Sequence, residues 1–136
     1  EKTTWQARGM TVATGPLMAA LQSLTVMGYE IHMGQSYRHP GVGSVFQLYR
    51  THEPETMIMD GAISSTGLIW GSYLHGLFDE DKFRRKYLNQ LRIRKGLVPL
   101  EEQFGFGESR QQAYNSLAGL VRENINMPAI YRLMDL

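Results

Sequence analysis

The clearest alternation of apolar and polar residues lies between residues 24 and 34, and it predicts a β-strand. One face of this strand carries Glu30 and His32. The other face is apolar and consists of Tyr29, Ile31 and Met33. A polar pair on one strand face can lie together at the edge of a site.

Further β-prone runs surround this strand, and Ser64-Ser65-Thr66-Gly67 is a turn sequence between the last two of them. Those two runs are therefore expected to form a hairpin. The opening of the chain is less informative, with a short β-prone run at 11–13. The later predicted strands are 44–51, 56–63 and 67–74.

After the hairpin the apolar positions change to helical spacing. Asp79 is a predicted N-cap, and Gly96 follows two basic residues as a helix stop. The apolar side chains between them recur every four residues, as Phe83, Tyr87 and Leu91.

Two more helices are expected near the C-terminus. The first spans about 109–124, and Pro128 suits the first turn of a short last helix. The stretch 105–107 is too short for a linker between domains, so residues 1–136 are predicted to form a single α/β unit. The apolar stripe of the first of these helices is Ala113, Leu117, Leu120 and Val121.

Composition excludes several classes of protein. The 136 residues are 43% hydrophobic and 20% charged, which is typical of one folded domain. A net charge of +1 gives no footprint for nucleic acid, and no apolar run approaches the length of a membrane span. A cytoplasmic protein is expected. The chain has no cysteine, which excludes disulfides, thiolate metal sites and a cysteine nucleophile within these residues.

His75 is the residue that best suits acid/base chemistry. It follows a predicted strand and precedes Gly76, and ligands of open α/β sheets bind beside such strand ends. Its intrinsic pKa suits proton transfer near neutral pH. A single imidazole does not establish chemistry, however, and a surface histidine at a turn fits the same pattern.

Glu30 and His32 admit two interpretations. They could form part of an active-site wall, with Glu30 orienting His75 or binding a substrate, or they could be a buried polar pair that satisfies loop backbone groups. Tyr73 beside His75 is a candidate for the same wall. No metal is expected, because the histidines, Glu30 and Asp60 lack the local spacing of metal ligands.

Two runs, Gly28-Tyr-Glu-Ile-His-Met-Gly34 and Gly71-Ser-Tyr-Leu-His-Gly-Leu-Phe-Asp79, together resemble the C-terminal amidotransferase half of the cobyric acid synthases. The likeness extends to Asp60-Gly-Ala-Ile-Ser64 and covers the chain from about residue 28 onward. It implies part of a class I glutamine amidotransferase-like, flavodoxin-like domain, with the N-terminal strands and the nucleophile elbow missing. Residues 1–136 would then be the C-terminal part of that domain.

The resemblance also implies a chemistry. In that family a cysteine attacks the side-chain amide of glutamine, and the residue matching His75 acts as base and then as acid toward ammonia. The ammonia would amidate the b, d, e and g carboxylates of adenosylcobyrinic acid a,c-diamide, in cobalamin biosynthesis. Glutamine and a corrinoid would be the substrates, and an upstream synthetase domain would be the partner. That absent domain would use ATP and Mg²⁺, whereas this chain would hold no cofactor.

This sequence departs from the family pattern at three points. The cysteine is absent, so the isolated chain is predicted to be inactive. His75-Gly76-Leu77 lacks the His-x-Glu of many class I relatives, so the group that orients His75 is unassigned. Gln35-Ser36 stands where the family often has Arg-Thr.

Two alternatives to the leading hypothesis remain. One is a Cys-His amidotransferase that acts on another acceptor, such as a peptidoglycan lipid. The other is a non-catalytic module that kept the amidotransferase shape and binds a partner.

Overall fold

The computed structural model describes residues 2–34, 36–101 and 105–135. The chain divides into two compact units, residues 1–104 and 105–136, and each is described by itself. The sequence predicted a single unit. The structure differs because the helices after residue 105 carry no buried side chain, so one core does not extend over the whole chain. The assignment of all 136 residues to one amidotransferase domain stays a prediction.

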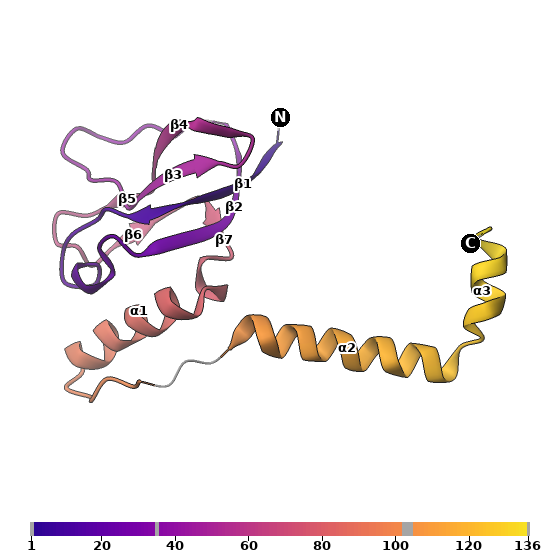
Figure 1. The fold of residues 1–136 in the computed structure, drawn as a ribbon. Coiled ribbons are helices and arrows are strands. Elements are labelled where there is room, and N and C mark those ends of the chain that lie inside the picture. The colour runs from indigo at the N-terminus through magenta and orange to yellow at the C-terminus, as the bar shows by residue number, and fades with distance from the viewer. Residues whose placement is uncertain (1, 35, 102–104, 136) are drawn as a thin grey trace. The chain divides into compact units, whose positions relative to one another are not determined.

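The first unit contains a five-stranded sheet, a small hairpin and one α-helix (Figure 1). The order in the sheet is β4-β3-β1-β2-β7, and every described pairing is antiparallel. The α/β class predicted from sequence is confirmed. The elements are β1 (Lys2–Thr11), η1 (Ala19–Leu21), β2 (Thr25–Met33), β3 (Phe46–Arg50), β4 (Glu53–Asp60), β5 (Ala62–Ile63), β6 (Trp70–Gly71), β7 (Leu74–His75), η2 (Leu77–Asp79) and α1 (Asp81–Arg94).

Strand β2 confirms the strand predicted between residues 24 and 34. The predicted hairpin is also confirmed, because β5 pairs with β6 around the 64–67 turn. Its strands are shorter than expected, since Gly61 has a positive φ of 75° and separates β4 from β5. Glycine adopts this left-handed conformation without strain, and it allows the chain to bend there.

The sequence did not predict β1 before residue 11, although it is the central strand. Its inward residues include Ala7 and Gly9, which give no strong apolar alternation. A Cβ at position 9 would lie far closer than 3.0 Å to the carbonyl oxygen of Gln47 on β3. Close backbone approach, rather than apolar side-chain volume, therefore selects the small residue.

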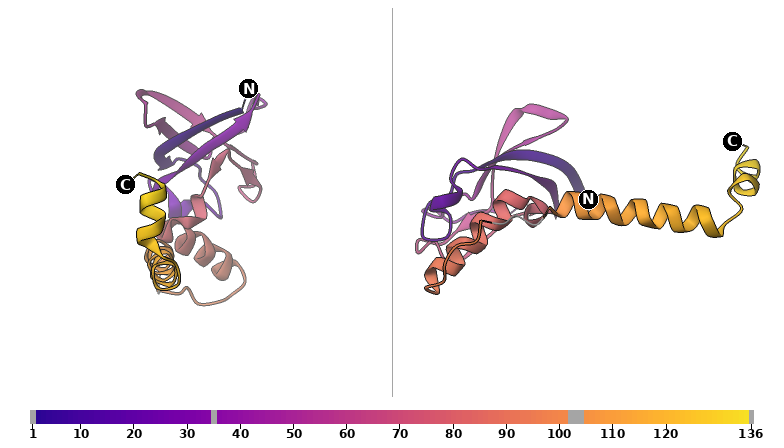
Figure 2. Two further views of the ribbon diagram at one scale, coloured as in Figure 1. Left: turned by 90° about the vertical axis from the view of Figure 1, so that its right-hand side faces the viewer. Right: turned by 60° about the horizontal axis from the view of Figure 1, so that its bottom comes forward.

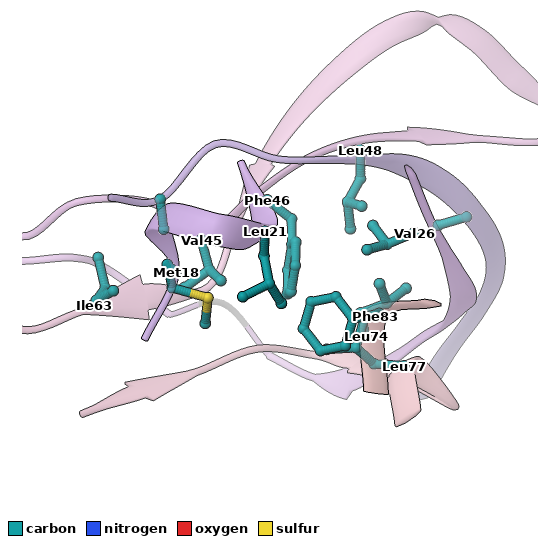
Figure 3. Packing of buried hydrophobic residues seen from close by; sticks show 12 residues of the cluster. Met18, Leu21, Val26, Val45, Phe46, Leu48, Ile63, Leu74, Leu77 and Phe83 are labelled. Atoms are coloured by element: carbon teal, nitrogen blue, oxygen red, sulfur yellow. The ribbon is translucent and has the colours of Figure 1, made fainter. Parts of the chain in front are cut away.

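Buried side chains from the strands and from α1 pack together in the core of the first unit (Figure 3), and α1 lies on one side of the sheet (Figure 2). The side chain of Phe83 from α1 is fully buried, and its ring lies 6.0 Å from that of Phe46 on β3. Val26 comes from β2 and Leu74 from β7, and Leu48 lies on β3 with Phe46. This core holds β7 against β2 and so places His75 at the sheet.

Helix α1 ends as predicted at a glycine with positive φ, Gly96, but it begins one residue later than expected. Glu80 is the N-cap, and its carboxylate accepts a hydrogen bond from the backbone N–H of Phe83 at 3.2 Å. Asp79 belongs instead to η2.

The second unit consists of α2 (Phe106–Asn124) and α3 (Met127–Leu133). Both helices were predicted, and Pro128 lies in the first turn of α3 as expected. The predicted stripe on α2 is largely exposed, with Leu117 58% and Leu120 60% accessible. Among the described residues, no helix has both the length and the apolar character needed to cross a membrane.

Candidate active site

His75 is the exposed last residue of β7, between two buried side chains. Leu74 before it is 6% accessible and Leu77 after it is 4% accessible. Gly76 has a φ of 78°, which turns the chain sharply between His75 and Leu77. The backbone of His75 is thus fixed by its neighbours while its imidazole faces solvent.

The register of β2 and β7 separates the predicted site residues. Tyr29 pairs with His75, and Glu30 pairs with Leu74. Because successive strand residues point to opposite faces, His75 shares a face with exposed Tyr29, whereas Glu30 lies on the face of the core. The structure therefore does not bring Glu30 to the imidazole of His75.

Glu30 is 4% accessible, and its carboxylate is held by two partners. Arg50 donates from Nε to one oxygen at 2.7 Å and from Nη2 to the other at 3.0 Å. The Nε2 atom of His32 lies 3.1 Å from Glu30 Oε1. Glu30, His32 and Arg50 thus form one connected cluster of polar side chains.

Burial by itself would raise the pKa of Glu30. The hydrogen bonds and charge of Arg50, with a smaller effect of His32, outweigh burial and hold the pKa of Glu30 below its ordinary value. The same contact, led by the hydrogen bond to Glu30, raises the pKa of Arg50. Both groups are therefore charged near neutral pH.

Arg50 was missed by sequence reasoning, although a signal was present. It is the third inward residue of β3, after Phe46 and Leu48, and a charge in that position indicates a buried partner. Its guanidinium reaches Glu30 across the central strand β1, where buried Ala7 is its register partner. It also lies 5.7 Å from the ring centre of Trp5.

A cavity of about 530 Å³ opens beside this ion pair. His32 and Tyr73 both line it, and their rings lie 4.7 Å apart between centroids. The Tyr73 hydroxyl forms a short hydrogen bond with the hydroxyl of Ser36. Three of the four residues singled out from sequence, Glu30, His32 and Tyr73, therefore meet at one cavity, which His75 does not line.

Buried Asp60 supports this cavity from β4. Its carboxylate accepts hydrogen bonds from the Ser72 hydroxyl and, at 3.4 Å, from the backbone N–H of Tyr73. Ser72 in turn accepts from the backbone N–H of Leu74 at 2.9 Å. The segment that leads into β7 is thereby tied to β4. Within the described ranges, no group of three or more histidine or acidic residues is placed to hold a metal ion.

Residues 1–83, more than half of the chain, match the family model of the CobB/CobQ-like glutamine amidotransferase domain. The chain belongs to this family. The matched range contains β7 with His75 and the cavity beside β2.

Proteins named cobyric acid synthase are similar to this amidotransferase chain over nearly its whole length. The one from Citrobacter koseri is 40% identical over 136 residues, which is 99% of this chain and 26% of the relative. That from Caldanaerobacter subterraneus subsp. tengcongensis is 38% identical over 137 residues, covering 99% and 27%. That from Klebsiella pneumoniae subsp. pneumoniae is 42% identical over 134 residues, covering 98% and 26%.

The amidotransferase chain thus spans about a quarter of the length of these relatives. No solved structure gave a significant match.

Proposed function

We propose that this chain is the histidine-bearing part of the glutaminase of a cobyric acid synthase. The observation that carries the proposal is the placement of His75, exposed at the end of a strand that the core and Gly76 hold in place. Support also comes from the 38–42% identity to proteins named cobyric acid synthase. The chain has no cysteine, so the nucleophile would come from outside these 136 residues.

In the proposed reaction, the imidazole of His75 takes the thiol proton of that cysteine. The thiolate then attacks the amide carbon of glutamine, and His75 returns the proton to the departing ammonia. Water would release glutamate from the thioester. This chain alone, without the thiol, would not hydrolyse glutamine.

Glu30, His32 and Tyr73 are proposed as the wall that binds or orients substrate in the same domain. The cavity that they line supports this role. The carboxylate of Glu30 is occupied by Arg50 and His32, so we assign Glu30 a part in shaping the wall rather than in orienting His75.

The proposal includes the rest of the enzyme. A synthetase domain using ATP and Mg²⁺ would activate the b, d, e and g carboxylates of adenosylcobyrinic acid a,c-diamide, and the ammonia would amidate them in the cytoplasm. The described strands pair only in antiparallel fashion. The parallel strands of a flavodoxin-like domain and the nucleophile elbow would therefore lie outside the described residues.

The test is to replace His75 by Ala in the full-length enzyme and to measure amidation with glutamine and with free ammonia. Glutamine-dependent amidation should be lost, whereas ammonia-dependent amidation should persist, because free ammonia bypasses the glutaminase. His39→Ala is the control, since His39 is exposed and does not line the cavity.

Two outcomes would contradict the proposal. Unchanged glutamine-dependent amidation in His75→Ala would remove His75 from the reaction. Absence of both activities from the folded wild-type enzyme would favour a non-catalytic module that binds a partner.

A further inference from the structure

Gly76 lies directly after His75 in a backbone conformation that other residues rarely adopt. Its φ is 78°, in the left-handed region. The next residue, Leu77, is buried in the core cluster, whereas His75 is exposed. The left-handed turn is what allows two residues so close in sequence to face the core and the solvent.

Gly28 lies against the same residue from the neighbouring strand. A Cβ at position 28 would lie far closer than 3.0 Å to the carbonyl oxygen of His75, and 3.1 Å from the side chain of Leu74. A larger residue in β2 would therefore push the end of β7 away from the sheet. Gly28 and Gly76 constrain the backbone of His75 from two independent directions.

We infer that Gly28 and Gly76 are positioning residues for the His75 imidazole. This inference rests on the proposed glutaminase function, because the position of His75 matters only if its imidazole transfers a proton to or from a partner. Neither glycine has a side chain that could touch a substrate. A displacement of about 1 Å at a reacting group can lower a rate about 100-fold, so the backbone placement is a direct determinant of turnover.

The first test compares two substitutions of Gly76 in the full-length enzyme. Gly76→Val forces a β-branched residue into the left-handed region, whereas asparagine tolerates that region. Gly76→Val should lower kcat for glutamine-dependent amidation about 10- to 100-fold, with little change in KM and in ammonia-dependent amidation. Gly76→Asn should keep most of the glutamine-dependent activity.

Gly96→Val is the matched control. Gly96 has a φ of 70°, and a Cβ there would meet nothing within 4 Å, so the added strain is similar but lies at the end of α1. Both activities should stay close to wild type. If Gly76→Val does not fold, Gly76→Ala gives the same comparison, because the nearest atom to its Cβ would be 3.7 Å away.

The second test compares Gly28→Ala with Gly9→Ala. Each places a Cβ against a backbone carbonyl of a neighbouring strand, that of His75 for position 28 and that of Gln47 for position 9. Gly28→Ala should lower glutamine-dependent amidation more than ammonia-dependent amidation. Gly9→Ala should change the two activities by similar factors. Thermal unfolding followed by circular dichroism establishes that each variant is folded.

These experiments distinguish a failure of the positioning role from a failure of the proposed glutaminase function. If His75→Ala loses glutamine-dependent amidation while folded Gly76→Val and Gly28→Ala retain it, the positioning role is wrong and the proposed function stands. The positioning role is also wrong if Gly76→Asn loses as much activity as Gly76→Val. If His75→Ala keeps wild-type turnover with glutamine, the proposed function fails, and this inference fails with it.

Discussion

Arg50 and Glu30 form a two-point ion pair across the central strand of the sheet. The Nε and Nη2 atoms of Arg50 reach the two carboxylate oxygens of Glu30 at 2.7 and 3.0 Å. Glu30 lies on β2 and Arg50 on β3, with β1 between them. The pair therefore joins strands that are not neighbours, at the margin of the cavity.

Replacement of Arg50 by Met should destabilise the chain strongly. It leaves the buried carboxylate of Glu30 without its main cationic partner, and the expected loss is about 3 kcal/mol in the free energy of unfolding. Urea unfolding at neutral pH measures it. The double variant Arg50→Met/Glu30→Gln should be more stable than Arg50→Met alone, because no unpaired charge is then buried.

Glu53→Gln is the control for this ion pair. Its carboxylate is 3.5 Å from Arg50 Nη1, but its side chain is 45% exposed. The expected change is at most about 0.5 kcal/mol. A loss in Arg50→Met no larger than in Glu53→Gln would show that the buried pair contributes little.

The stability of the chain should fall in acid because of Glu30. Its folded pKa lies below the ordinary value of 4.5, so its contribution is fully present above pH 4.5 and is lost as pH falls through the folded pKa. Urea unfolding at a series of pH values between 7 and 3, in wild type and Glu30→Gln, measures this. The variant should be less stable at neutral pH but should lose less on acidification; parallel pH profiles would contradict the assignment.

His32→Ala should give an intermediate loss of glutamine-dependent amidation with folding intact. The imidazole of His32 lines the cavity and contacts Tyr73, but it contributes less than Arg50 to holding Glu30. Turnover should lie between wild type and His75→Ala. Met33→Ala is the control, because Met33 is 72% exposed and does not line the cavity. Wild-type turnover in His32→Ala would leave His32 with a structural role only.

Phe83→Ala should remove much of the stability of the first unit. Its ring is fully buried against Phe46, and such a truncation costs about 3–5 kcal/mol. Leu88→Ala in the same helix removes a side chain that is 40% exposed and should cost about 1–2 kcal/mol, less than Phe83→Ala. The two variants are compared by the denaturant concentration at the midpoint of unfolding. Equal midpoints would mean that Phe83 is not central to the core.

The local pattern of residues predicted much of the secondary structure. Alternation between residues 24 and 34 located β2, and spacing around Phe83 located α1, because these segments have periodic apolar faces. Strand β1 was missed because its inward residues Ala7 and Gly9 are small, and Gly9 lies against the backbone of β3. That requirement leaves no periodic signal in the strand itself.

For the candidate site, sequence by itself determined which residues to consider: His75 at a strand end before Gly76, and Glu30 with His32 on one strand face. Tertiary structure decided how they are grouped. The antiparallel register places His75 opposite Tyr29, and it places Glu30 on the core face within reach of Arg50. The reason is physical: alternation fixes the faces within one strand, but only pairing between distant segments decides which face is buried and which charge lies beside it.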